Sequence, residues 1–189
     1  MIITLGGRAG AGKSSVGRAL AELSGYKFYS AGDVRREYAL KHGLTLAELN
    51  EKAKLDPASD FIVDDYMKSM AVREDNFVID AWLAFHFFPQ SIKVFLDADK
   101  NLRAKRIYGR NNLEELSTTL EEAMIKMTEK EDCSAARYRK LYGIDIYDLN
   151  NYDLVVDTTN KSVEATTVVV YDFMGNFAKF RGFKTSHFS

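Results

Sequence analysis

The stretch Gly6–Ser15, "GGRAGAGKSS", follows the apolar run Met1–Leu5, "MIITL", and precedes residues 16–23, "VGRALAEL". The apolar run predicts a short buried strand, and the apolar positions Val16, Leu20 and Leu23 recur at helical spacing. Dense glycine pressed between a strand and a helix is typical of a tight turn rather than of a mobile tail. The local order is therefore strand, glycine turn, helix.

Gly7–Ser14 matches the pattern G-x-x-x-x-G-K-[ST]. In this pattern the glycines let the backbone curl so that N–H groups point at phosphate oxygens, and the following helix adds its positive N-terminal end. We expect Lys13 to reach the β and γ phosphates and the Ser14 hydroxyl to hold Mg²⁺. A turn that only connects strand and helix would explain Gly10 and Gly12, but not the lysine. The predicted phosphate-binding residues are Gly7, Arg8, Ala9, Gly10, Ala11, Gly12, Lys13, Ser14 and Ser15.

Four further strand-like runs follow, at residues 26–30, 76–82, 92–99 and 152–159, with helical patterns between them. Their nearly continuous apolar character predicts a parallel sheet covered on both faces. The fold class is therefore α/β, a P-loop NTPase with three α/β/α layers and a five-stranded parallel sheet. We expect one domain over residues 1–189.

The pattern of residues 33–73 predicts an insertion that consists of helices and contains no strand. Asp33 is expected to cap its first helix, Gly43 to end it, and Thr45 with Glu48 to cap the next. Pro57 separates a third helix. A second helical stretch follows residue 110, and both stretches are expected above the carboxyl edge of the sheet, where open α/β sheets bind ligands.

Charge and composition limit the partners. The 26 basic side chains nearly cancel the 27 acidic ones, so no global field is available to capture nucleic acid or an anionic membrane. The single cysteine, Cys133, fits a reducing compartment, and no run approaches the length of a membrane span. We therefore expect a cytoplasmic protein with no nucleic-acid or membrane partner. The oligomeric state stays open, with a monomer favoured.

Asp80 ends the run "FVID" in the manner of a Walker B strand, and we expect its carboxylate to hold Mg²⁺ together with Ser14. Asp97 and Asp157 end other strands and are assigned to turn chemistry.

Basic side chains concentrate in the segments expected above the glycine turn. Arginine forks match phosphate geometry and suit the charge that develops during phosphoryl transfer. The candidates are Arg36, Arg106, Arg110, Lys130, Arg137 and Arg139. The alternative, an ordinary solvated helix charge, is assigned to Arg103, Lys105 and Arg139.

Several segments together resemble the cytidylate kinases, particularly the short archaeal type and related bacterial forms. They are residues 6–37, "DPASD" at 56–60, "VID" at 78–80, "RIYGR" at 106–110 and residues 134–159. The resemblance runs from residue 1 to about 170. It implies a nucleoside monophosphate kinase that uses ATP and Mg²⁺, with a monophosphate-binding insertion at about 33–73 and a closing lid at about 110–140.

The resemblance also implies residue roles. Asp33 and Arg36 would bind the acceptor nucleotide, Arg106 would lie near the ATP base, Arg110 would approach the phosphates and Arg137 would belong to the lid. Lys13, Arg110, Arg137 and Asp80 are thus the predicted catalytic group. Closure of a lid would exclude water, which would otherwise hydrolyse ATP.

The chain departs from the family pattern at two places. The family usually has Gly-Arg after the third strand, whereas this chain has Ala81 and Trp82, and Lys130 stands where a lid arginine is usual. An indole cannot donate a fork of charged hydrogen bonds. We therefore keep Trp82 as a predicted substrate contact, with core packing as its alternative.

The hypothesis from sequence is phosphoryl transfer from ATP to CMP or dCMP. One alternative is a P-loop kinase with a different small acceptor, which the change at Trp82 favours. Another is a nucleotide-binding regulator that has lost catalysis. The aromatic and basic tail, residues 172–189, lies beyond the resemblance and is expected to end a packed helix and then fray.

Overall fold

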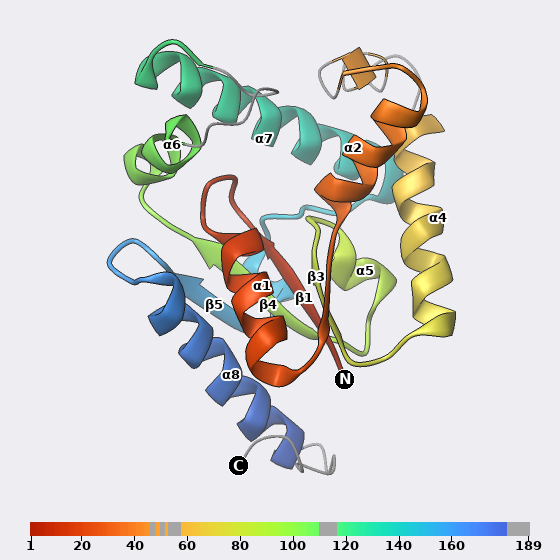
Figure 1. Cartoon of the computed structure of the whole chain (residues 1–189), viewed down its shortest axis with the longest axis vertical. Helices are drawn as coiled ribbons and strands as arrows, with labels where there is room; N and C mark the ends of the chain where they lie inside the picture. The colour runs from red at the N-terminus through yellow and green to blue at the C-terminus, as the bar shows by residue number, and fades with distance from the viewer. Residues whose placement is uncertain (46–47, 50–51, 53–57, 110–116, 181–189) are drawn as a thin grey trace.

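The computed structural model describes residues 1–45, 48–49, 52, 58–109 and 117–180. The parallel strands are β1 (Ile2–Gly7), β2 (Lys27–Ser30), β3 (Phe77–Asp80), β4 (Ile92–Asp97) and β5 (Leu154–Asp157). They form one five-stranded sheet in the order β2-β3-β1-β4-β5, with β1 at its centre (Figure 1). The predicted α/β fold class is confirmed.

Helices lie on both faces and above the carboxyl edge of the sheet (Figure 1). They are α1 (Lys13–Ser24), α2 (Ala31–Lys41), α4 (Ala58–Arg73), α5 (Ala84–Phe87), α6 (Lys100–Tyr108), α7 (Leu120–Tyr142) and α8 (Val163–Phe180). A short 3₁₀ turn, Leu149–Asn151, precedes β5.

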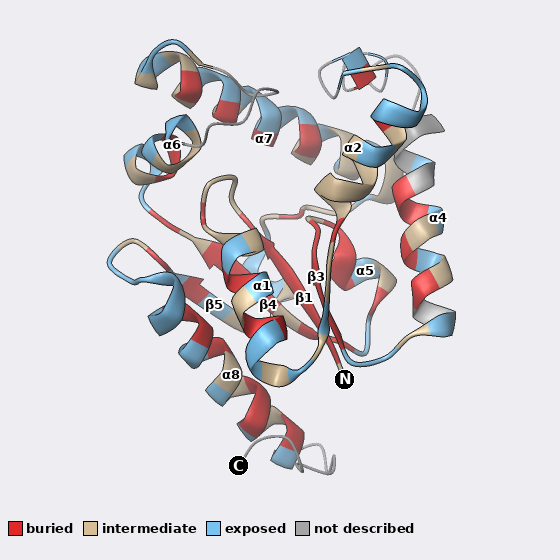
Figure 2. Cartoon of the chain, in the orientation of Figure 1, coloured by how far each residue is buried: buried red, intermediate tan, exposed pale blue. Residues whose placement is uncertain are grey.

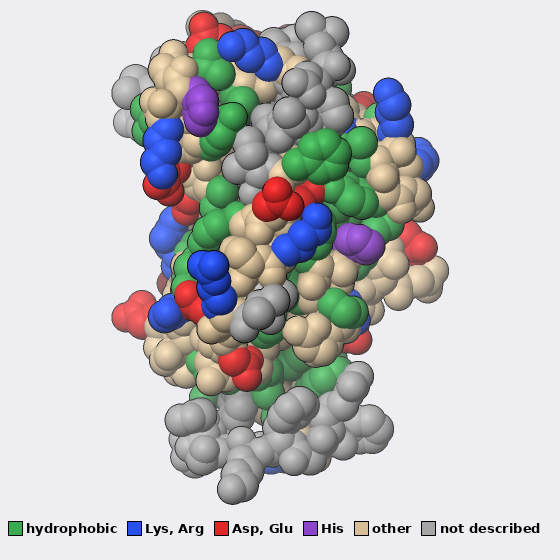
Figure 3. Space-filling model, turned by 90° about the vertical axis from the view of Figure 1, so that its right-hand side faces the viewer, with side chains coloured by type: hydrophobic (Ala, Val, Ile, Leu, Met, Phe, Trp, Pro, Cys, Tyr) green, Lys and Arg blue, Asp and Glu red, His purple; other side chains and the backbone are tan. Residues whose placement is uncertain are grey.

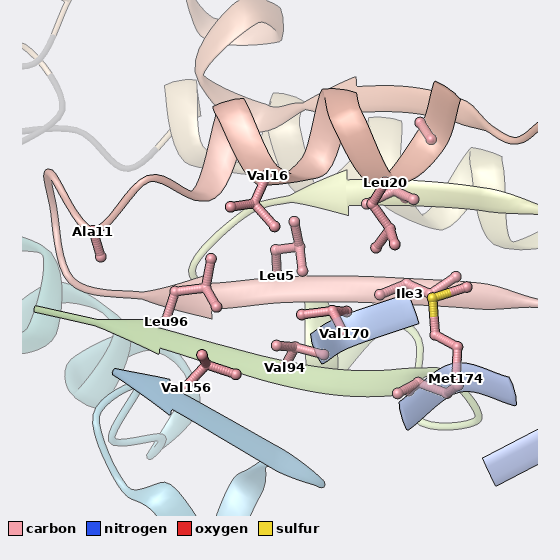
Figure 4. Close-up of a cluster of buried hydrophobic side chains, with 13 residues drawn as sticks. Ile3, Leu5, Ala11, Val16, Leu20, Val94, Leu96, Val156, Val170 and Met174 are labelled. Atoms are coloured by element: carbon pink, nitrogen blue, oxygen red, sulfur yellow. The ribbon is translucent and has the colours of Figure 1, made fainter. Parts of the chain in front are cut away.

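The core has two layers because successive strand residues point to opposite faces. Ile3 and Leu5 of β1 pack with Val16 and Leu20 of α1 and with Met174 of α8 (Figure 4). The opposite face of the sheet packs against α4 and α5 and contributes Ile2, Phe77 and Ile79. Figure 2 shows that β1 and β3 are buried along their length. Burial on both faces explains why these strands are almost wholly apolar.

The start of α2 corrects one prediction. Asp33 does not cap this helix, because the helix begins two residues earlier at Ala31 and the Ser30 hydroxyl accepts the Asp33 N–H. Ser30 has the extended backbone of an N-cap residue, and Asp33 lies in the first turn. The next predicted cap is confirmed, since Thr45 and Glu48 bond reciprocally through side chain and backbone.

The helix α7 is a single element of 23 residues that crosses above the carboxyl edge from beside α6 toward α4 (Figure 1). Its buried face includes Ala123 and Met127, which are about one helical turn apart. Cys133 is an exposed residue of this helix.

The tail begins as predicted. Residues 172–180 continue α8, with Met174 and Ala178 buried, and residues 181–189 lie outside the described part of the chain. None of the helices that the structure describes is both long enough and apolar enough to span a lipid bilayer.

The packing predicts a large loss of stability on truncation of Phe88. Its side chain is fully buried, with its ring edge-on to Phe77 at 5.3 Å. Phe88→Ala should lower the free energy of unfolding by about 3–5 kcal/mol. The matched control, Phe61→Ala, removes a ring that is 46% exposed on α4 and should cost below about 0.5 kcal/mol. Urea unfolding followed by circular dichroism measures both, and equal losses would contradict this picture of the core.

Candidate active site

The loop from Gly7 to Gly12 joins β1 to α1, and three of its glycines have positive φ angles. The angles are 128° at Gly7, 78° at Gly10 and 96° at Gly12. A Cβ atom at Gly7 would lie 2.0 Å from the Leu96 carbonyl oxygen, and one at Gly10 would lie 2.6 Å from the Arg103 carbonyl oxygen. The loop is therefore seated directly on the backbone of β4 at Leu96 and of α6 at Arg103, where no side chain fits.

The first turn of α1 is available to an anion. Gly12 occupies the N-cap position and contributes no side-chain cap, and the helix ladder begins with the Val16 N–H bonded to the Gly12 carbonyl. The N–H groups of a first helical turn lack intrahelical acceptors and carry the positive end of the helix dipole. This is the geometry that binds phosphate at the start of a helix.

Lys13 is folded back over the loop. Its ammonium donates to the carbonyl oxygens of Gly7 at 3.1 Å and Arg8 at 2.8 Å. The Trp82 indole N–H donates to the same Gly7 oxygen at 2.8 Å, and the Lys13 ammonium lies 5.8 Å from the Trp82 ring centroid. Trp82, at the end of β3, is thus a neighbour of both the loop and its lysine.

The Ser14 hydroxyl donates to the Asp80 carboxylate at 2.5 Å. Asp80 ends β3 and is only 8% exposed, while the adjoining Ala81 N–H donates to Leu5 on β1. The parallel register of the two strands therefore brings together the two oxygen ligands that the sequence predicts for Mg²⁺. Hard oxygen donors are what this ion prefers, so the pair fits it.

A cavity of about 450 Å³ opens beside the loop. It lies between the start of α1, the end of α6 and the connection from β5 to α8; its lining includes Gly12, Ser15, Arg106, Thr158, Ser162 and Val163. Arg106 donates to the hydroxyl and carbonyl oxygens of Thr158, whose hydroxyl in turn donates to the Ala11 carbonyl. Arg106 is thus connected through Thr158 to Ala11 of the loop.

Arg103 and Glu131 form a buried ion pair in this region that the sequence analysis does not predict. Arg103 is not a solvated helix charge, because it is only 6% exposed and its guanidinium lies 2.7 Å from the Glu131 carboxylate, which is 4% exposed. Nothing local in α6 marks Arg103. Glu131 did carry a signal, because it continues the four-residue spacing of Ala123 and Met127 and so places a charge on the buried face of α7.

Arg8 packs beside this pair. Its guanidinium lies 3.7 Å from the Tyr147 ring centroid and 3.4 Å from the Glu131 carboxylate. Burial, and then the negative charge of Glu131, raise the pKa of Tyr147 above its ordinary value. The Tyr147 ring serves as a packing surface for Arg8.

Asp33 and Arg36, the predicted acceptor contacts, pair with each other on α2, and Arg18 donates to Asp33 at 3.2 Å. Arg137 is half-buried on α7, with its guanidinium 5.1 Å from the Tyr138 ring centroid. Lys130 is exposed on the same helix. Arg110 lies outside the described residues. The substrate and catalytic roles of these residues stay predictions.

The two aspartates assigned to turn chemistry behave accordingly. Asp157 accepts the N–H and hydroxyl of Thr159, and Asp97 accepts the Ala98 N–H. Arg139 is exposed and pairs with Asp145 at 2.7 Å, as expected of a solvated helix charge.

The glycine loop, the Ser–Asp pair and the sheet order define the class of P-loop proteins with the kinase fold. Solved structures of this fold include the shikimate kinase of Acinetobacter baumannii in complex with shikimate. It has a TM-score of 0.64 at 21% identity, covering 93% of each chain. The shikimate kinase of Aquifex aeolicus has a TM-score of 0.58 at 22% identity, covering 94% of this chain and 98% of that one.

Sequence relatives narrow the class. The cytidylate kinase of Methanothrix thermoacetophila is 37% identical over 84% of this chain and 88% of that protein. That of Pyrococcus furiosus is 38% identical, covering 90% and 86%. The model of the cytidylate kinase-like family matches residues 2–160. The chain belongs to the cytidylate kinase-like family, and it is an enzyme of the nucleoside monophosphate kinase class.

The seat of the loop predicts a specific effect of Gly7→Ala. The added methyl group would meet backbone, which cannot move aside, so we expect the loop to be displaced and ADP affinity to fall by about a hundredfold or more. Gly43→Ala is the matched control, because Gly43 also has a positive φ (65°) but has open space around it. It should cost about 1 kcal/mol of stability and leave ADP affinity unchanged. Calorimetric titration of both variants checks this, and tight ADP binding by Gly7→Ala would refute it.

Proposed function

We propose that the protein transfers the γ-phosphoryl group of ATP to CMP or dCMP, giving ADP and the pyrimidine nucleoside diphosphate. The observation that carries the proposal is the meeting of Lys13 and the Ser14–Asp80 pair at the glycine loop. The family and its relatives named cytidylate kinase support the acceptor.

In the proposed reaction an oxygen of the acceptor phosphate forms a bond to the γ-phosphorus. The bond from that phosphorus to the β,γ-bridging oxygen breaks, and ADP leaves. The protein contributes position and charge rather than a covalent intermediate. Lys13 would exchange the carbonyl oxygens of Gly7 and Arg8 for phosphate oxygens, and the first-turn N–H groups of α1 would bind the β-phosphate.

Ser14 and Asp80 would hold the Mg²⁺. When bound, this ion neutralises charge on the phosphate oxygens. The cavity beside the loop would take the nucleoside part of ATP, with Arg106 at its wall.

The acceptor would bind between the insertion and the lid. Its phosphate would draw Arg36 away from Asp33, and Arg110 and Arg137 would cover the transferring group. On the face shown in Figure 3, acidic and basic side chains are interspersed rather than separated, so positive charge for the phosphates would have to come from such local groups.

A kinase with a different small acceptor is the second candidate. The contact of the Trp82 indole with the Gly7 carbonyl favours it, because this residue presents no cation at the end of β3. A regulator without catalysis would bind ATP and show no turnover. A cytoplasmic location and a monomeric state stay predictions.

Turnover should depend on Lys13 and on a pyrimidine acceptor. ADP release from ATP and Mg²⁺ is measured with CMP, dCMP, UMP, AMP and GMP, and we expect fast turnover with CMP or dCMP. Lys13→Ala should reduce kcat by about a thousandfold or more, because one charge of the transition-state site is lost. Full activity of this variant would mean that a different loop binds the phosphates. Wild-type ATP binding with no turnover across the panel would favour the second candidate or the regulator.

Arg106→Ala should act on ATP alone. Removal of its bonds to Thr158 loosens the wall of the cavity, so we expect the KM for ATP to rise about tenfold with little change in the KM for the acceptor. Lys105→Ala is the control, since Lys105 is exposed on the same helix. Steady-state kinetics with each substrate varied in turn separate the two constants. An unchanged KM for ATP would remove Arg106 from the donor site.

A further inference from the structure

The peptide groups on the two sides of Ala9 are each held by a buried charged side chain. The Ala9 N–H donates to the Glu131 carboxylate at 2.8 Å, and the Ala9 carbonyl accepts from the Arg103 guanidinium at 3.1 Å. The two side chains bond each other at 2.7 Å. Helix α6, which follows β4, and helix α7, which lies above the carboxyl edge of the sheet, therefore both contact the loop at Ala9.

The geometry of this pair is narrowly defined. Arg103 also donates to the Ala98 carbonyl at 3.0 Å, which fixes its guanidinium to the connection between β4 and α6. A buried ion pair has lost its water, so it is stable only when nearly all of its donors and acceptors are matched. If either side chain moved far, the other would be left as a buried charge without its partner.

The two peptide planes carry groups that the proposed reaction uses. The Ala9 N–H belongs to the same planar peptide as the Arg8 carbonyl, which accepts the Lys13 ammonium at 2.8 Å. The Ala9 carbonyl belongs to the same peptide as the Gly10 N–H, and in a trans peptide these two point in opposite directions. Glu131 thus orients the Arg8 carbonyl, which Lys13 would leave when it binds phosphate, and Arg103 orients the Gly10 N–H.

We propose that Glu131 and Arg103 are positioning residues for the phosphate-binding loop, which fix the two peptide groups of Ala9 and so set the Gly10 N–H for the donor phosphates. The inference rests on the proposed binding of ATP at this loop. Neither side chain needs to touch the nucleotide. Each acts through a backbone group of the loop.

Glu131→Gln is the first test variant, because an amide oxygen can still accept the Ala9 N–H but loses the charge that holds Arg103. We expect the dissociation constants for ADP with Mg²⁺ and for pyrophosphate to rise about tenfold, with the acceptor KM within twofold of wild type. Glu129→Gln is the control, since Glu129 is exposed on the same helix. It should bind ADP as the wild type does.

Single truncations of a buried ion pair can unfold a protein. The double variant Arg103→Met with Glu131→Leu removes both charges, and such apolar replacements are often neutral for stability. We expect it to melt near the wild-type temperature but to bind pyrophosphate about a hundredfold more weakly, because the Ala9 peptides are released.

The outcomes are distinguishable. Weak pyrophosphate binding by a double variant of wild-type stability supports positioning. The inference is overturned if the double variant has both the stability and the pyrophosphate affinity of the wild type. It is also overturned if Glu131→Gln has wild-type dissociation constants for ADP and pyrophosphate. If the wild type phosphorylates CMP and the variants bind ADP and pyrophosphate as tightly as the wild type does, only this inference is overturned. If the wild type binds no ADP, the proposed function is overturned as well.

Discussion

The whole site depends on how closely the loop after β1 approaches its neighbours. The Gly7 position of β1 is paired with Leu96 of β4, and the Arg8 N–H donates to the Leu96 carbonyl at 3.0 Å. At Gly10 the loop also meets backbone, since a Cβ atom there would lie 2.6 Å from the Arg103 carbonyl oxygen of α6. Because no side chain fits at either point, the backbone itself forms the surface. The central strand, the start of α1 and α6 are thereby fixed relative to one another. This arrangement determines where the side chains of Lys13, Ser14 and Asp80 lie.

Much of this could be predicted from sequence because it is local. A glycine turn of fixed spacing lies between a strand and a helix, so Lys13 and Ser14 must follow at the start of α1, and Asp80 ends a strand that parallel pairing brings alongside. The Ser30 cap was missed because Asp33, three residues later, has the same chemistry. Arg103 was missed for a different reason. Its partner is 28 residues away, and only tertiary packing turns a charged helix position into a buried one.

The helix α7 links the two sides of the candidate site. Glu131 and Tyr142 are separated by about three helical turns and therefore lie on the same side of the helix. One contacts the loop at Ala9, and the hydroxyl of the other donates to the Asp64 carboxylate on α4, where Asp64 is 3% exposed. A helix is stiff over this length, so its placement on the loop and its placement on α4 cannot be varied separately. The lid assigned to about 110–140 stays a prediction, and any closure of it would have to include the contacts of Glu131 and Tyr142.

Trp82 shows how a departure from a family pattern can be understood from its contacts. An indole has one donor and no charge, and here that donor is used on the Gly7 carbonyl, the same oxygen that the Lys13 ammonium contacts. The residue therefore contacts the glycine loop from the end of β3. If an acceptor phosphate binds nearby, its charge has to be balanced by arginines that other elements supply. Arg36 is one candidate, since the Ser30 cap of its helix pairs with Asp80 in the sheet.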